Sequence, residues 1–94
     1  MWMRVGRSRI DPARINEDST LLDDIAEAFR QLPGFQSYML GVDRTTGQFV
    51  NVSTFDTEEH AHWLPTREDL NARIQALGSQ SGGPPEYYEV ASQA

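Results

Sequence analysis

Two histidines, His60 and His62, stand near the middle of the chain, and the sequence contains no others. Imidazole titrates near neutral pH, so either ring could serve as a general base in catalysis. The alternative is a solvated histidine in the first turn of a helix, where the helix dipole favours the neutral ring. Residues two apart point to different sides of a helix, and only Glu58 and Glu59 stand beside this pair, so we predict no metal site.

A second set of residues offers polar and aromatic groups for binding a small-molecule substrate. One face of a predicted strand carries Asn51, Ser53 and Phe55. A buried amide or hydroxyl on that face needs a hydrogen-bond partner. On a pocket wall they would orient a carbonyl or a phenol, whereas at a dimer interface they would bond to a second subunit. Tyr38 adds a phenolic donor. Trp63 either stacks on a planar substrate or fills the core.

Cations and further phenols stand near the two ends of the chain. Arg7 and Arg9 share one face of a predicted strand, where a guanidinium would bind a carboxylate or enolate oxygen. The alternative is a salt bridge with one of the fourteen acidic residues. Tyr87 and Tyr88 point to opposite sides of a strand, so at most one of them reaches a given pocket.

The elements that must position these residues follow a β-α-β-β-α-β order. Alternating apolar residues predict strands over 2–10, 35–42, 48–55 and 86–91, and the loop 43–47 predicts a hairpin between the middle two. Asp11-Pro12 predicts a turn after the first strand. A helix is predicted from an apolar stripe at spacings of three and four: Leu21, Leu22, Ile25, Ala28, Phe29 and Leu32.

The boundaries of both predicted helices carry capping and breaking residues. Asp18, Ser19 and Thr20 are candidate caps of the first helix, and Pro33-Gly34 ends it. A capping box from Asp56 to Glu59 begins the second helical segment. Pro65 interrupts that segment, a new cap follows at 66–69, and a second apolar stripe continues through Leu70, Ile74 and Leu77.

This order predicts a ferredoxin-like α+β fold, in which a four-stranded antiparallel sheet carries both helices on one face. Both faces of the sheet bear large apolar residues. The prediction places Tyr38, Leu40 and Val42 on one face and Phe35, Met39 and Gly41 on the other, and Val50 and Val52 alternate with Phe49 and Phe55. Since helices cover only one face, we expect a homodimer formed by sheet-to-sheet packing.

Length and composition exclude several classes of protein. The 94 residues predict a single domain spanning 1–94, without cysteine and so without disulfide or thiolate chemistry. A net charge of −6 and the lack of a continuous arginine stripe argue against nucleic-acid binding. No apolar run is long enough to span a membrane, and no signal peptide is recognisable at the start. We therefore expect a soluble, cytoplasmic protein that does not bind membranes.

Three segments resemble the antibiotic biosynthesis monooxygenase (ABM) superfamily of dimeric α/β-barrel proteins. They are Leu32-Pro33-Gly34-Phe35 at the entry to a strand, the hairpin loop 43–47, and the strand-to-helix junction from Phe49 to Ala61. The order of elements extends the likeness over nearly the whole chain. The resemblance implies a homodimeric barrel with a pocket between sheet and helices in each subunit.

Some relatives oxidise aromatic polyketides without metal or flavin, and others degrade haem. Haem-degrading members use an Asn on the first strand, a Trp on the second helix and a His about three turns further. Trp63 matches the Trp, but Arg73 stands in place of the His and the first strand has no Asn, so haem degradation is not expected. Phe55 stands where many members have Trp.

Two functions are left open by the sequence. The resemblance implies a small-molecule-binding protein, and within it a cofactor-independent monooxygenase acting on an aromatic or polyketide-like substrate. In that role His60 or His62 takes a proton, Asn51 or a tyrosine holds an oxygen atom, and Trp63 stacks on the substrate. The alternative is a non-catalytic dimeric protein that binds a ligand or contributes to an assembly.

Overall fold

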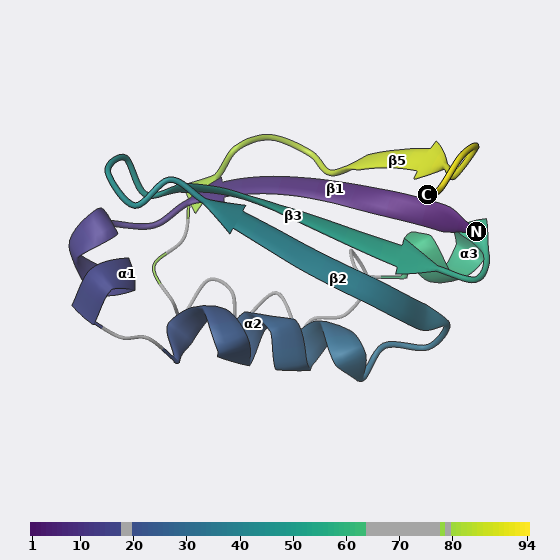
Figure 1. The fold of residues 1–94 in the computed structure, drawn as a ribbon, viewed down its shortest axis with the longest axis horizontal. Helices are drawn as coiled ribbons and strands as arrows, with labels where there is room; N and C mark the ends of the chain where they lie inside the picture. Colours follow the sequence, from purple (N-terminus) through teal and green to yellow (C-terminus); the bar gives the residue numbers. More distant parts are fainter. Residues whose placement is uncertain (18–19, 64–77, 79) are drawn as a thin grey trace.

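The computed structural model describes residues 1–17, 20–63, 78 and 80–94. Its helices and strands are shown in Figure 1 and follow the chain in this order: β1 (Trp2–Arg9), α1 (Pro12–Glu17), α2 (Leu21–Arg30), β2 (Phe35–Val42), β3 (Gln48–Phe55), α3 (Glu58–Ala61), β4 (Gln80–Ser81) and β5 (Glu86–Glu89). The predicted break at Pro65, the cap at 66–69 and the stripe at Leu70, Ile74 and Leu77 lie outside the described residues.

All strands pair antiparallel in one sheet, in the order β2-β3-β1, with β4 and β5 both on the far side of β1. β4 pairs with Ser8 and Arg9, whereas β5 pairs with the segment from Trp2 to Val5. The two short strands therefore share one edge position. This arrangement confirms the predicted α+β fold with a four-stranded antiparallel sheet of ferredoxin-like order.

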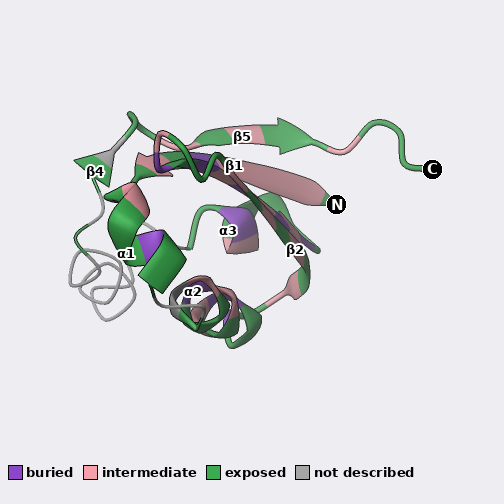
Figure 2. Cartoon of the chain, turned by 60° about the vertical axis from the view of Figure 1, so that its left-hand side comes forward, coloured by how far each residue is buried: buried purple, intermediate pink, exposed green. Residues whose placement is uncertain are grey.

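The described helices lie on one side of the sheet, and Figure 2 shows α1, α2 and α3 on that side. Helix α2 carries the predicted apolar stripe, because Ile25 and Phe29, with Leu32 just beyond the helix, are buried against Phe55. A smaller cluster around Ile10, Ile15 and Phe49 fills the space beside α1. Burying each large apolar side chain contributes about 1.5–3 kcal/mol, so these contacts hold the helices on this face.

Two helices begin differently from the sequence prediction. Asp11-Pro12 begins α1 rather than a simple turn, because Asp11 Oδ1 accepts a hydrogen bond from the Ala13 N–H at 2.9 Å. Pro12 takes the first helical position, where its missing donor costs nothing. Helix α3 is capped by Thr57, one residue after the predicted cap at Asp56. The Thr57 hydroxyl accepts a hydrogen bond from the His60 N–H at 3.2 Å.

The predicted hairpin between β2 and β3 is confirmed, and its loop is stabilised by Asp43. One carboxylate oxygen of Asp43 accepts hydrogen bonds from the N–H groups of Thr45 at 2.9 Å and Thr46 at 3.3 Å. Gly47 has a φ of 79°, the left-handed backbone conformation that glycine adopts without strain. The loop thereby returns the chain into β3 and fixes the register between the two strands.

The face assigned to Phe35 from the sequence is wrong. The β2–β3 register shifts between Phe35 and Ser37, and this irregularity places Phe35 opposite Phe55. Their rings lie edge to face with centroids 6.3 Å apart, on the helix-covered side. The extra residue reverses the alternation, which sequence periodicity cannot reveal. Met39 lies on the opposite, outer face and is 76% exposed.

Candidate functional site

A line of polar side chains crosses the helix-covered face of the sheet from edge to edge. Tyr87 of β5 lies opposite Arg4 of β1, Arg4 lies opposite Ser53 of β3, and Ser53 lies opposite Tyr38 of β2. Directly opposed residues of paired strands share a face, so all four project toward the helices. We call these four residues the polar row.

The guanidinium of Arg4 bends along its own strand and reaches the next cross-strand pair. Its Nη1 donates a hydrogen bond of 3.2 Å to Asn51 Oδ1, and its carbon Cζ lies 5.8 Å from the centre of the Phe29 ring. Gly6, opposite Asn51, leaves the space for this path. A methyl group on Gly6 would lie 3.0 Å from both Arg4 Nη1 and Asn51 Oδ1. Any larger residue at this position would have to displace one of the two side chains.

Each member of the polar row has a buried polar atom without a hydrogen-bond partner. Among the described residues these atoms are Arg4 Nε, Tyr38 Oη, Ser53 Oγ and Tyr87 Oη, and no residue outside the row contributes another. Leaving a buried donor or acceptor unsatisfied costs about 1–3 kcal/mol. Four such groups in one row amount to a concentrated, unused capacity to bind a polar ligand.

Burial shifts the pKa of two residues in the row, and both nevertheless stay in forms that donate hydrogen bonds. Burial raises the pKa of Tyr38, and the charge of nearby Arg4 opposes this shift only in part. Burial likewise lowers the pKa of Arg4, which the proximity of Tyr87 opposes. An arginine titrates so far above neutral pH that it stays charged. The row therefore presents one cation and neutral hydroxyl donors.

Aromatic rings stand at both ends of the row. Phe29 of α2 contacts Tyr38 with ring centroids 4.7 Å apart and an angle of 40° between the rings. At the other end His62, just after α3, stacks on Tyr87 at 3.7 Å with an angle of 20°. Flat apolar faces beside convergent donors are typical of sites that bind planar organic molecules.

Four of the residues predicted to bind substrate lie together on this helix-covered face. Asn51 is 7% exposed and Ser53 has no exposed surface, and Tyr38 extends the same region. Phe55 is also fully buried, but it lies within the apolar core beside Phe35. Asn51, Ser53 and Tyr38 are therefore brought together with Arg4, whereas Phe55 supports the site from the core.

The structure separates the other three predicted site residues. His60 Nδ1 lies 2.5 Å from Asp56 Oδ1, which makes this ring part of a local pair on the junction after β3. The hydrogen bond with His60 also holds the pKa of Asp56 below its usual range. His62 reaches the site through Tyr87, and its Nε2 lies 3.8 Å from a Glu58 oxygen. Trp63 follows His62 and is 40% exposed.

The sequence prediction omits Arg4 and selects Arg7 and Arg9, which lie on the opposite face. Successive strand residues point to opposite faces, so the sequence places Arg4 on a different face from Arg7 and Arg9. This difference is one signal that could have identified Arg4. The second signal is Gly6, since glycine inside a strand often marks a close approach of neighbouring groups. Neither signal reveals that β5 places Tyr87 beside Arg4, because that pairing joins the two ends of the chain.

The sequence matches no family model and no curated protein, whereas the structure matches many solved structures. A protein from Deinococcus radiodurans, assigned by name to the antibiotic biosynthesis monooxygenases, superimposes with a TM-score of 0.74 at 19% identity. That match covers 100% of this chain and 96% of the other. SnoaB from Streptomyces nogalater, a cofactor-independent oxygenase, gives a TM-score of 0.71 at 18% identity, over 98% and 94% of the two chains. A similarly assigned protein from Chloroflexus aurantiacus gives 0.68 at 14% identity, over 99% and 96%.

The chain has the antibiotic biosynthesis monooxygenase fold. This confirms the resemblance inferred from the segments at 32–35, 43–47 and 49–61. At these identities the comparisons establish the architecture alone. The function of the site depends on the residues of this chain.

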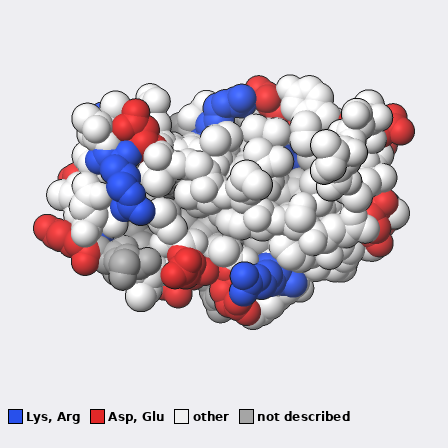
Figure 3. Space-filling model, viewed as in Figure 1, with Lys and Arg blue, Asp and Glu red and all other residues white. Residues whose placement is uncertain are grey.

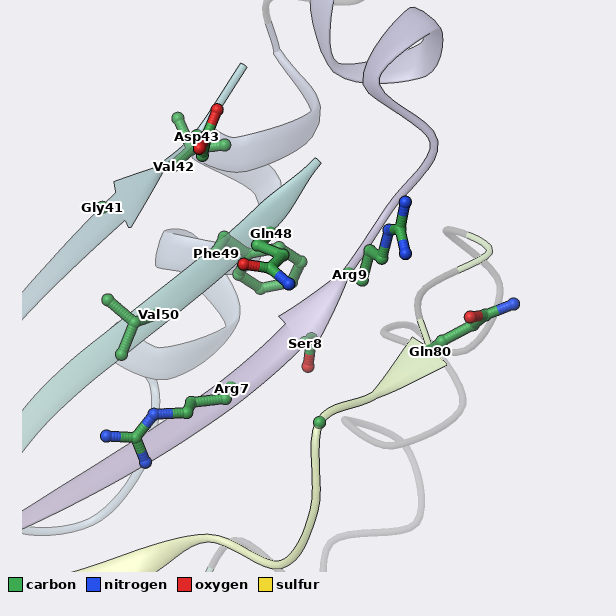
Figure 4. A pocket seen from close by; sticks show the side chains of 11 residues that line it. Arg7, Ser8, Arg9, Gly41, Val42, Asp43, Gln48, Phe49, Val50 and Gln80 are labelled. Atoms are coloured by element: carbon green, nitrogen blue, oxygen red, sulfur yellow. The ribbon is translucent and has the colours of Figure 1, made fainter. Parts of the chain in front are cut away.

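A hollow of the ABM-fold sheet, separate from the polar row, lies near the hairpin end of β1 and β3. It has a volume of about 570 Å³, and Figure 4 shows Arg7, Arg9 and Val50 among the side chains around it. Both arginines already have partners. Arg7 Nη1 forms a 3.0 Å ion pair with Glu86, and Arg9 Nε donates to the Thr46 carbonyl at 3.1 Å. This hollow therefore offers less unused binding capacity than the polar row.

The described residues contain neither a cluster of metal-binding side chains nor a membrane-spanning helix. Residues 1–17, 20–63, 78 and 80–94 contain no group of three or more His, Asp or Glu side chains arranged to hold a metal ion. None of the described helices is long and apolar enough to cross a membrane. On the face seen in Figure 3, acidic and basic side chains are scattered around an uncharged centre without forming a basic stripe.

Proposed function

We propose that this ABM-fold protein binds an aromatic or polyketide-like small molecule at the polar row and oxidises it as a cofactor-independent monooxygenase. The observation that carries the proposal is the set of four buried, unpartnered polar atoms on one row, beside the ring of Phe29. A bound ligand with oxygen substituents would satisfy these groups. Structural likeness to SnoaB, which is a cofactor-independent oxygenase, supports the choice of reaction.

The proposed reaction converts an activated CH₂ group of the substrate into a carbonyl. A base removes one proton, and the resulting carbanion, delocalised into the aromatic system, reacts with O₂ to form a C–O bond. One oxygen atom stays as the carbonyl, and the other leaves as water with the two hydrogen atoms. Hydrogen bonds to the substrate oxygen stabilise the delocalised negative charge and so favour proton loss.

Within this proposal, His62 is better placed than His60 to act as the base. His62 stacks on Tyr87 of the polar row, whereas the Nδ1 atom of His60 is held by Asp56. Asn51 presents its amide nitrogen to a substrate oxygen, because its Oδ1 already accepts from Arg4. Trp63 adjoins His62 in the chain and provides a further aromatic surface for the substrate.

Oxygen uptake by the purified protein tests this function. We expect consumption of O₂ with hydroxylated polycyclic anthrones, one O₂ per quinone formed, without added metal or flavin. Asn51→Ala should lower kcat/KM roughly 10- to 100-fold, since one hydrogen bond to a developing oxyanion is lost. Asn16→Ala, which alters an exposed asparagine of α1, is the matched control and should retain activity. An uptake rate equal to that of buffer for every compound would reject the reaction.

A non-catalytic ligand-binding role is the second candidate, and one observation favours it. Among the hydrogen bonds of the described residues, none joins either histidine side chain to the polar row. Such a protein would bind the same planar molecules at the same residues and release them unchanged. Ligand binding without O₂ uptake would therefore select this role.

We further propose that the outer face of the sheet is covered by a second copy of the chain. This face carries Val5, Val52 and Met39 in one cross-strand line, and Met39 is 76% exposed. Sheet-to-sheet packing would remove these side chains from water. Sedimentation velocity tests the dimer. The protein should sediment as a dimer at micromolar concentration, Met39→Arg should yield monomer, and Gln31→Arg at the end of α2 should not.

A further inference from the structure

The Arg4 guanidinium is largely buried and has no carboxylate partner among the described residues. The described acids that pair with arginine do so elsewhere, Glu86 with Arg7 and Glu27 with Arg30. Arg4 instead donates from Nη1 to a neutral amide oxygen of Asn51, and its buried Nε has no acceptor. The chain has a net charge of −6, yet no acid of the described residues forms an ion pair with this cation.

A buried guanidinium of this kind is costly when it lacks a counter-charge. Moving an ion out of water is unfavourable unless an opposite charge and hydrogen bonds compensate. The Phe29 ring face and the single Asn51 oxygen compensate only in part, and the pKa of Arg4 is lowered by burial. An anionic oxygen atom placed at Nε would supply both the missing charge and the missing acceptor.

The neighbours of Arg4 in the row are also able to donate. Ser53 on one side and Tyr87 on the other carry unpartnered hydroxyl groups, and the Tyr38 hydroxyl follows beyond Ser53. None of these side chains is a carboxylate, and each hydroxyl can donate a hydrogen bond. An acceptor-rich, negatively charged group therefore suits this row better than a neutral one.

We propose that the polar row selects planar ligands that carry an anionic oxygen, either a carboxylate or an ionised phenol, and that Arg4 is the residue that determines this preference. The inference rests on the proposed small-molecule site, and it adds the charge of the ligand. The Arg4 fork matches the two oxygens of a carboxylate or one phenolate oxygen, and the adjacent hydroxyls complete the anion's hydrogen bonds.

Calorimetric titration with 2-naphthoate and 2-naphthamide tests the preference, because these probes share size and shape and differ in charge. We expect the wild-type protein to bind naphthoate roughly tenfold or more tightly than naphthamide, the ratio of a charge-assisted to a neutral hydrogen bond. Arg4→Met should reduce the ratio to below about threefold while naphthamide affinity changes little. Arg9→Met removes an outer-face arginine and should leave the ratio unchanged.

A second variant keeps the test decisive if Arg4→Met folds poorly. Arg4→Lys retains the charge and loses the planar fork, so it should still prefer naphthoate, with a smaller ratio than the wild type. Equal wild-type affinity for the two probes would overturn the charge preference and leave the small-molecule site intact. An unchanged ratio in Arg4→Met would overturn the role of Arg4. Failure of both probes to bind would instead contradict the ligand site itself, and the charge preference with it.

Discussion

Arg4 and Asn51 are joined across the β1–β3 pair by a hydrogen bond of 3.2 Å that passes over Gly6. Arg4 has no carboxylate partner among the described residues, so Asn51 is its main polar contact. This bond links a partly buried cation on one strand to a buried amide on the next. It occupies Asn51 Oδ1, while the buried Nε of Arg4 has no partner.

Coupling between these two residues is the first prediction. Asn51→Leu should lower the free energy of unfolding by about 1–3 kcal/mol, because Arg4 loses its acceptor while remaining charged. Arg4→Met should be neutral or stabilising, since an apolar side chain of similar length replaces an incompletely paired charge. In the Arg4→Met background, Asn51→Leu should cost at least about 1 kcal/mol less than in the wild type. Urea unfolding of the four proteins measures the cycle, and strict additivity would contradict the coupling.

Gly6 provides a steric test of the same contact. Gly6→Ala places a methyl group against Arg4 and Asn51, so we expect the free energy of unfolding to fall by about 1–3 kcal/mol. Gly41→Ala is the matched control on the neighbouring β2 strand, because the nearest atom to its methyl group is a Val50 methyl at 3.7 Å. Thermal unfolding of Gly6→Ala and Gly41→Ala measures the loss of stability in each variant. Equal effects of the two substitutions would show that Arg4 does not occupy the space over Gly6.

Ser53 should affect stability and binding in opposite directions. Its hydroxyl is fully buried and unpartnered, so Ser53→Ala should raise the free energy of unfolding by about 1 kcal/mol in the unliganded protein. The same change should weaken binding of 2-naphthoate severalfold. The control is Ser37→Ala on the exposed side of β2. Its hydroxyl already has a partner, a 2.5 Å hydrogen bond with Thr54, so its removal should not raise the free energy of unfolding. A loss of stability in Ser53→Ala would mean that this hydroxyl has a partner within the protein.

Much of the fold is predictable from the sequence because local periodicity determines it. The stripe of α2 and the alternation of β3 follow from the sequence, and this alternation groups Asn51, Ser53 and Phe55 on one face without showing which face the helices cover. The face of Phe35 is not predictable in this way, since a one-residue irregularity reverses it. Arg4 becomes a site residue only through its pairing with Tyr87, at the other end of the chain.

The different positions of His60 and His62 relative to the site have a similar explanation. A spacing of two indicates that His60 and His62 face different sides, and the structure agrees. Which of them approaches the site depends on where α3 meets β5, and no periodicity encodes that contact. Charge patterning is equally uninformative for Arg4, because tertiary structure decides whether a described acid approaches it.

The pair of Asp56 and His60 predicts a dependence of stability on pH. The hydrogen bond lowers the pKa of Asp56, so its contribution to stability is present above the unfolded-state pKa and is lost as pH falls through the folded-state value. We expect the free energy of unfolding to fall as pH drops below about 4, and Asp56→Asn to make this decline shallower. His60→Gln should have the same effect on the slope, and the double variant should add nothing further. Urea unfolding across pH 2–6 measures this, and unchanged slopes in both single variants would contradict it.

Mapping of 2-naphthoate on the protein by ¹H–¹⁵N NMR tests the polar row most directly as the ligand site. We expect the largest shift changes at the Arg4 Nε–H and the Asn51 side-chain amide, with further changes at the backbone amides of Ser53 and Tyr87. Changes confined to Met39, Val50 and Val52 on the outer face, with the Arg4 Nε–H unmoved, would contradict it.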